Sequence, residues 1–231
     1  MTDHLPRYPH VNVTLYRSAR AFFRFLVALL VKKVDIQGME NLPHEGAFVL
    51  ATNHLSFLDS PLLFVTIPRT MYVLAGEKYQ RHIFAPILRI AGAIFVQRGE
   101  VDRNALRQAT NALEDGHCLA IAIEGTRSKT GKLIPGKTGV AYVATRTHVP
   151  IVPVVVWGTE RIIPTWKRLH RPEVHVRFGK MFRLPEGRTH SKELDAYTDD
   201  IMTTMASMLP EEYRGVYEDH PLLTQKLANN K

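Results

Sequence analysis

The chain has 231 residues, 45% of them hydrophobic, which is enough for a substantial core and favours one large domain, alone or with a small appendage. Its 30 Lys and Arg residues against 22 Asp and Glu residues give a net charge of +8, which favours phospholipid surfaces, nucleic acid or phosphorylated substrates as partners. No apolar run reaches the roughly 20 residues that cross a bilayer, the N-terminus lacks a secretory pattern, and the single cysteine excludes an internal disulfide.

The first predicted element is a helix over residues 15–30. Apolar residues recur at helical spacing along it, and arginines recur three and four residues apart on another face. The helix is too short to span a bilayer, but it suits an interface position with arginines among lipid phosphates. The alternative is a helix packed on its own domain with a solvated basic face. We expect residues 1–33 to form an amphipathic, membrane-associating segment and residues 34–231 to form the main domain. The residues concerned are Leu15, Ala19, Phe22, Leu26 and Leu29 on the apolar face, and Arg17, Arg20 and Arg24 on the basic face.

From Val34 onward, short β-rich runs alternate with helical patterns. This alternation predicts an α/β fold with a mixed, largely parallel sheet flanked by helices, whose site lies beyond the carboxyl ends of the strands. Cys118 lies within one of the apolar runs and is expected to be a core residue rather than a nucleophile. The predicted strands are 47–51, 71–75, 93–97, 118–123, 151–157 and 173–178, and the predicted helices lie around Pro61 and over 78–88, 102–114, 138–147 and 191–208.

The motif Asn53-His-Leu-Ser-Phe-Leu-Asp59 directly follows the first of these strands. An imidazole can accept a proton near neutral pH, and a carboxylate on its other ring nitrogen would fix the tautomer and stabilise the imidazolium. His54 and Asp59 are therefore candidates for a general base and the group that orients it. The competing interpretation is local structure, because Ser56 followed three residues later by Asp59 is also a capping box that starts a helix.

This motif matches the NHxxxxD signature of the glycerolipid acyltransferases, and three further blocks follow in that family's order. Together the blocks cover about 120 residues, and the chain resembles bacterial 1-acyl-sn-glycerol-3-phosphate acyltransferases of the PlsC type. One departure concerns the third block, where Ala122-Ile123 replace the usual Phe-Pro, which affects the expected loop geometry and substrate identity. The three further blocks are Ala93-Ile-Phe-Val-Gln-Arg-Gly99, Ile123-Glu-Gly-Thr-Arg-Ser128 and Val149-Pro-Ile-Val-Pro-Val154.

Two of the blocks place arginines after strands. Arg98 and Arg127 would meet where parallel strands end, and their planar guanidinium groups suit a phosphate monoester. Gly125 would let the backbone approach the ligand closely, and Glu124 would either orient Arg127 or accept a hydrogen bond from a substrate hydroxyl. The resemblance adds Thr126 and Lys137 to the predicted substrate-binding residues, Lys137 as a further cation near the substrate phosphate.

The sequence argues against two other kinds of site. Residues 131–138 satisfy the phosphate-loop pattern GxxxxGK[ST], but seven residues separate them from the preceding strand, which argues against nucleoside triphosphate binding. The eleven histidines show no metal-ligand spacing such as HExxH, so no metal is expected.

The resemblance implies an enzyme that transfers a fatty acyl group from acyl-CoA or acyl carrier protein to 1-acyl-glycerol-3-phosphate, giving phosphatidic acid. It implies no cofactor beyond the thioester co-substrate, and a peripheral or monotopic position on the cytoplasmic face of the inner membrane. Alternatives are an acyltransferase for glycerol 3-phosphate, another lysolipid or a glycolipid, and a noncatalytic basic module that binds membrane or nucleic acid. No recognisable nucleic-acid motif accompanies the basic charge, so we expect no nucleic-acid partner.

Overall fold

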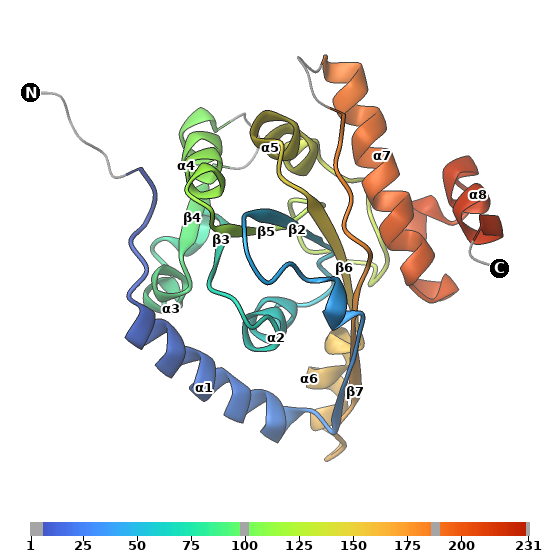
Figure 1. Cartoon of the computed structure of the whole chain (residues 1–231). Helices are drawn as coiled ribbons and strands as arrows, with labels where there is room; N and C mark the ends of the chain where they lie inside the picture. The colour runs from blue at the N-terminus through green and yellow to red at the C-terminus, as the bar shows by residue number, and fades with distance from the viewer. Residues whose placement is uncertain (1–6, 98–101, 186–189, 230–231) are drawn as a thin grey trace, which may run out of the picture.

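The computed structural model describes residues 7–97, 102–185 and 190–229, and in it helices cover both faces of a central sheet (Figure 1). The seven strands lie in the order β1-β7-β6-β2-β5-β3-β4. The strands are β1 (Lys33–Gln37), β2 (Phe48–Thr52), β3 (Met71–Gly76), β4 (Ala93–Val96), β5 (Cys118–Ala122), β6 (Ile151–Trp157) and β7 (Glu173–Phe178).

Five of these strands, from β6 to β4, run parallel to one another. β7 pairs with β6 in the antiparallel sense and β1 pairs with β7 in parallel, so the sheet is mixed. The predicted mixed, largely parallel sheet is confirmed. β1 was not among the predicted strands, because it begins at Lys33, within the segment 1–33 that is predicted to be helical.

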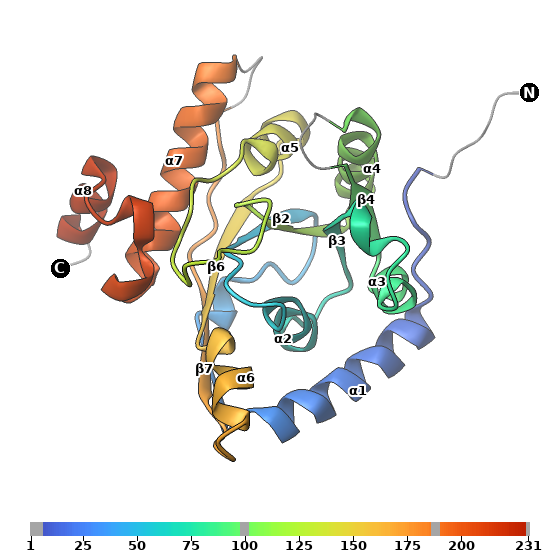
Figure 2. The same ribbon diagram turned by 180° about the vertical axis from the view of Figure 1, so that it is seen from behind.

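The helices form two layers. α4, α5 and α7 pack on one face of the sheet against Val49, Leu119 and Val155, while α2, α6 and the end of α1 pack on the other face against Leu50 and Val154. Both orientations of the ribbon show this arrangement (Figures 1 and 2). The helices are α1 (Val13–Leu30), α2 (Asp59–Thr66), α3 (Ala85–Ile90), α4 (Arg103–Glu114), α5 (Gly139–Thr147), α6 (Ile162–Trp166), α7 (Ser191–Met208) and α8 (Pro221–Asn229).

The helix predicted over residues 78–88 is wrong in its position. α3 begins only at Ala85, with Pro86 in its first turn, where the missing proline N–H costs no hydrogen bond. Residues 77–79 instead form a short 3₁₀ helix. α6 and α8 were not predicted, because neither shows enough apolar periodicity to stand out from the polar residues around it.

α1 runs along the edge of the domain and contacts α2 (Figures 1 and 2). The buried Tyr16 ring packs at 4.7 Å from the Phe64 ring, and the Tyr16 hydroxyl accepts a hydrogen bond from the Met71 N–H at 3.3 Å. The outward side of α1 carries Phe22 and Phe25, which are 56% and 66% exposed. In the residues that the structure describes, we find no helix with the length and apolarity that crossing a membrane requires.

Candidate active site

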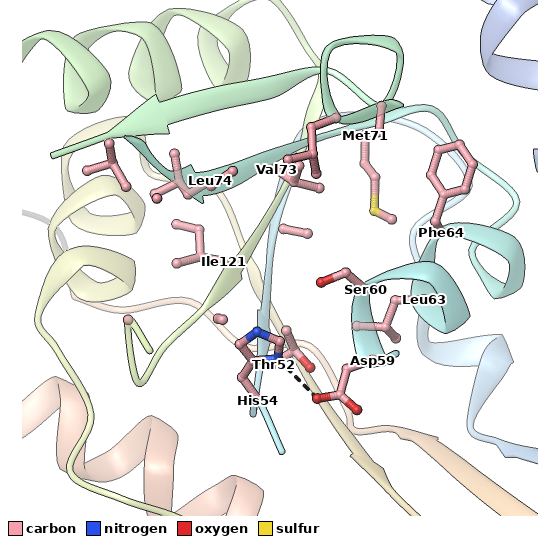
Figure 3. Close-up of a pocket in the computed structure, with 18 of the residues that line it drawn as sticks. Thr52, His54, Asp59, Ser60, Leu63, Phe64, Met71, Val73, Leu74 and Ile121 are labelled. Carbon is pink, nitrogen blue, oxygen red and sulfur yellow. Dashed lines mark hydrogen bonds and ion pairs between the residues drawn. The ribbon is translucent and has the colours of Figure 1, made fainter. Parts of the chain in front are cut away.

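His54 lies two residues beyond the end of β2, at the carboxyl edge of the parallel strands. Its Nδ1 atom is 3.0 Å from Oδ2 of Asp59, the first residue of α2 (Figure 3). The His54 side chain is 21% exposed and the Asp59 side chain only 2%. The two predicted catalytic residues are thus in contact, with the imidazole open to a ligand and the carboxylate enclosed.

The Asp59 carboxylate is held by several donors. Oδ2 also accepts the backbone N–H groups of Leu55 and Ser56, each at 2.7 Å, and Oδ1 accepts the Thr159 hydroxyl. In the tautomer that carries its proton on Nδ1, His54 donates to this carboxylate, and Nε2 then has a free lone pair that could accept a proton. The predicted capping box does not form, because α2 begins at Asp59 and its N-cap residue, Leu58, makes no side-chain cap hydrogen bond. The Asp59 carboxylate instead accepts amides of the preceding loop and faces His54.

Two polar residues that were not among the predicted site residues position this pair. Asn53 is fully buried and exchanges two 2.8 Å hydrogen bonds with the backbone of Val156, which ties the His54 loop to β6. Thr159 follows β6 and reaches Asp59 across 100 residues of sequence. The strand preceding Thr159 is fully buried, as the core interpretation of its apolar run predicted.

Glu124 follows β5 and is 1% exposed. Its two oxygens accept the backbone N–H groups of His54 at 2.7 Å and of Ile134 at 2.9 Å. Burial raises the pKa of this carboxyl to about 7, and the two amide donors oppose that rise. Glu124 thus connects the loop that carries His54 to the loop that carries Lys137.

Gly125 and Lys137 lie against each other. Gly125 has a left-handed φ of +66°, and a Cβ at this position would lie 2.8 Å from Cδ of Lys137. The Lys137 backbone N–H donates to the Ile123 carbonyl at 2.8 Å, which holds it beside the end of β5. Gly125 therefore makes room for the Lys137 side chain, and both residues line the same cavity as His54 and Asp59.

The other predicted phosphate-binding residues are placed differently. Thr126 and Arg127 are exposed in the turn after β5, and the lining of the cavity does not include them. Arg98 falls outside the described residues, so its predicted role is not tested. Three further cations line the cavity from α4 and α5, namely Arg103, Arg107 and Arg146.

The cavity itself has a volume of about 1270 Å³, above the roughly 300–1,000 Å³ of most small-molecule pockets. It opens where the sheet divides, because the pairing of β3 with β5 stops at Val73 and Ala120 while β5 continues beside β2. Leu74 and Ile121 face each other across this division (Figure 3). The part of the cavity between His54 and this division is lined mainly by apolar side chains.

A family model described as Acyltransferase matches residues 33–157. The chain is 31% identical over 169 residues to the chloroplastic 1-acyl-sn-glycerol-3-phosphate acyltransferase BAT2 of Brassica napus, an alignment that covers 68% of this chain and 48% of the relative. A 1-acyl-sn-glycerol-3-phosphate acyltransferase of Borreliella burgdorferi is 30% identical over 61% of this chain and 57% of its own.

The chain spans about half the length of these curated relatives. Among solved structures, the fold matches the 1-acyl-sn-glycerophosphate acyltransferase PlsC of Thermotoga maritima with a TM-score of 0.62 and 26% identity, covering 80% of this chain and 76% of the other. The matched region contains the His54–Asp59 pair, Glu124 and Lys137. From the family match and these relatives, the chain belongs to the acyltransferase family.

Proposed function

We propose that this protein transfers a fatty acyl group from acyl-CoA or acyl carrier protein to the free hydroxyl of 1-acyl-glycerol-3-phosphate, which yields phosphatidic acid. The observation that carries the proposal is the contact between His54 and Asp59 at the mouth of an apolar cavity. The 1-acyl-sn-glycerol-3-phosphate acyltransferases among the relatives support the choice of acceptor.

In the proposed reaction, Nε2 of His54 removes the proton from the acceptor hydroxyl while its oxygen attacks the thioester carbonyl carbon. Asp59 stabilises the imidazolium, the C–S bond then breaks, and the departing thiolate takes the proton from His54. The acyl group is transferred without a covalent enzyme intermediate. Alignment of the two substrates in one cavity provides much of the rate enhancement.

The lining of the cavity supports a division between lipid tail and phosphate. Apolar residues such as Leu63, Val73 and Ile121 extend away from His54 and suit an acyl chain (Figure 3). We assign the acceptor phosphate to Lys137, whose position beside Gly125 puts a cation on the same cavity as the base. Arg98, Thr126 and Arg127 remain proposed contributors to phosphate binding, and Glu124 is proposed to act by holding both loops.

We further propose that the enzyme works at the cytoplasmic face of the inner membrane, bound through α1. Phe25 and Leu29 are 66% and 48% exposed on this helix and suit the acyl boundary. Arg24 donates to the Val65 carbonyl at 3.4 Å and Arg20 is partly buried, so the exposed Arg17 is the cation freest to meet lipid phosphates. Phe25→Ser with Leu29→Ser should reduce sedimentation with anionic vesicles, and added salt should weaken binding of the wild type. If sedimentation is unchanged in both tests, α1 does not bind the membrane.

The activity is tested with the purified chain, lysophosphatidate and each acyl thioester in turn, with free thiol and phosphatidate measured together. His54→Ala should lower turnover by roughly 10²- to 10⁴-fold, the usual contribution of a general base. Glycerol 3-phosphate and other lysolipids serve as competing acceptors. Full activity of His54→Ala would overturn the proposed mechanism. Faster turnover of an acceptor without a phosphate would overturn the proposed acceptor.

A further inference from the structure

A second apolar surface lies outside the cavity, at α6 and the turn that follows it. We call residues 163–170 the α6 tip. Ile163, Trp166 and Leu169 are spaced three residues apart in it and are 58%, 43% and 96% exposed. The neighbouring Ile162 is buried in the core, which anchors the start of the tip to the domain. The tip is therefore fixed at its base and apolar on its outside.

Leu169 adopts an unusual backbone conformation. Its φ is +58°, in the left-handed region where the Cβ of an L residue is crowded. The N–H of Leu169 donates to the Trp166 carbonyl and the N–H of His170 to the Thr165 carbonyl, a helix ending at which glycine is usual. A leucine here carries backbone strain and exposes an apolar side chain, and no packing within the described chain offsets either cost. This points to a partner that covers the side chain.

The charge around the tip indicates what that partner is. Lys167 and Arg168 are exposed between Trp166 and Leu169. Apolar side chains between cations suit an anionic phospholipid surface, where the apolar groups enter the acyl boundary and the cations meet phosphates. A tryptophan at the edge of such a patch suits the interface, because its ring is apolar and its N–H is polar.

The tip is also tied to α1. The Arg171 guanidinium donates from Nη2 to the carbonyls of Ala28 and Val31 at 2.6 Å and 2.5 Å, so the turn after the tip holds the carboxyl end of α1. α6 and this end of α1 lie side by side in both views (Figures 1 and 2). The exposed Leu29 of α1 and the tip thus belong to neighbouring parts of one surface.

We propose that the α6 tip inserts Trp166 and Leu169 into an anionic phospholipid bilayer as a second membrane contact beside α1. This inference rests on the proposed function, since it takes the bilayer to be where the enzyme works. Two contacts fixed to each other through Arg171 would set the orientation of the domain on the membrane, which a single helix leaves free to rotate about its axis.

The test uses the full chain and its two tryptophans. Trp157 is 6% exposed and stacks on His175. Because the chain has two tryptophans, Trp157→Phe leaves Trp166 as the only one, and excitation selective for tryptophan reports on it alone. With vesicles of phosphatidylglycerol and phosphatidylcholine brominated on the acyl chains, its emission should shift to the blue and be quenched. The wild-type chain gives a second readout, because bromine in the bilayer reaches Trp166 and not the buried ring.

Leu169→Asn is the matched variant, because asparagine tolerates the left-handed conformation and removes only the apolar side chain. It should weaken vesicle binding by about tenfold or more, while Val216→Asn, at a residue 59% exposed in the C-terminal segment, should not change it. Leu169→Asn should turn over a short-chain soluble acceptor at the wild-type rate. If the wild-type protein itself shows no turnover of any acceptor, the proposed function is wrong, whatever the vesicle-binding result.

Three outcomes overturn the inference. If Trp166 stays unquenched in vesicle-bound protein, or if Leu169→Asn binds vesicles like the wild type, the tip does not enter the bilayer. A blue shift of Trp166 on adding acyl carrier protein without vesicles assigns the surface to an acidic protein partner.

Discussion

The Glu124 carboxylate accepts the backbone N–H of His54 at 2.7 Å, so a residue after β5 holds the loop that carries the proposed base. Its pKa is raised to about 7 by burial, against a usual value of 4.5. Between these two pH values the folded protein binds more protons at Glu124 than the unfolded chain does. This group alone therefore makes the free energy of unfolding fall as pH rises from about 4.5 to about 7.

Comparison with Glu124→Gln isolates this effect, because glutamine has a similar shape and does not titrate. Urea unfolding at several pH values should show the wild type losing stability relative to the variant as pH rises through this range. Other titrating groups are common to both proteins and cancel in the difference. A difference that stays constant with pH would mean that the Glu124 carboxyl keeps an ordinary pKa.

A second prediction separates the two roles of Asp59. Asp59→Asn should lower turnover by about 10²- to 10⁴-fold, because the amide no longer stabilises the imidazolium. Thr159→Val removes one donor to Asp59 and leaves the contact with His54 in place. It should therefore lower the free energy of unfolding by about 1–3 kcal/mol and reduce turnover far less than Asp59→Asn does. Turnover and urea unfolding are measured on both variants. If Asp59→Asn loses stability and keeps its turnover, the carboxylate serves the start of α2 alone.

The third prediction concerns the phosphate. Lys137→Ala should raise KM for the acceptor by about 10- to 100-fold, with little change in KM for the thioester, because it removes a charge-assisted contact. Gly125→Ala should have the same kinetic signature, since its Cβ would displace the Lys137 side chain. Arg127 is a proposed contributor to phosphate binding that lies exposed outside the cavity lining, so Arg127→Ala should raise KM for the acceptor less than Lys137→Ala does. Equal changes in both KM values would point to a general disturbance of the loop.

A fourth prediction concerns the mechanism without a covalent intermediate. Cys118 is buried at the start of β5, and burial raises the pKa of its thiol to about 11, so it is protonated at neutral pH. Cys118→Ser should therefore keep its turnover, and mixing enzyme with thioester alone should release no burst of thiol. A stoichiometric burst without acceptor would indicate an acyl-enzyme.

The sequence predicted the sheet and the pair at its edge because both leave local signals. The buried parallel strands are apolar runs, and His54 and Asp59 lie five residues apart in one motif. The partners that fix the pair are not local: Thr159 and Val156 come from β6 and its following turn, about 100 residues away. Nor does the sequence reveal that β3 separates from β5 beyond Val73, since register depends on pairing and not on composition.

One side chain of α1, Phe22, is 56% exposed and also lines the cavity. At this point only the Phe22 ring therefore separates the cavity from the outside of the protein. Each methylene of a lipid tail that passes through water costs about 0.8 kcal/mol, so for a long chain an aqueous detour would dominate the barrier to entry. Passage beside Phe22 would let the tail move from the apolar interior of a bilayer directly into the apolar cavity.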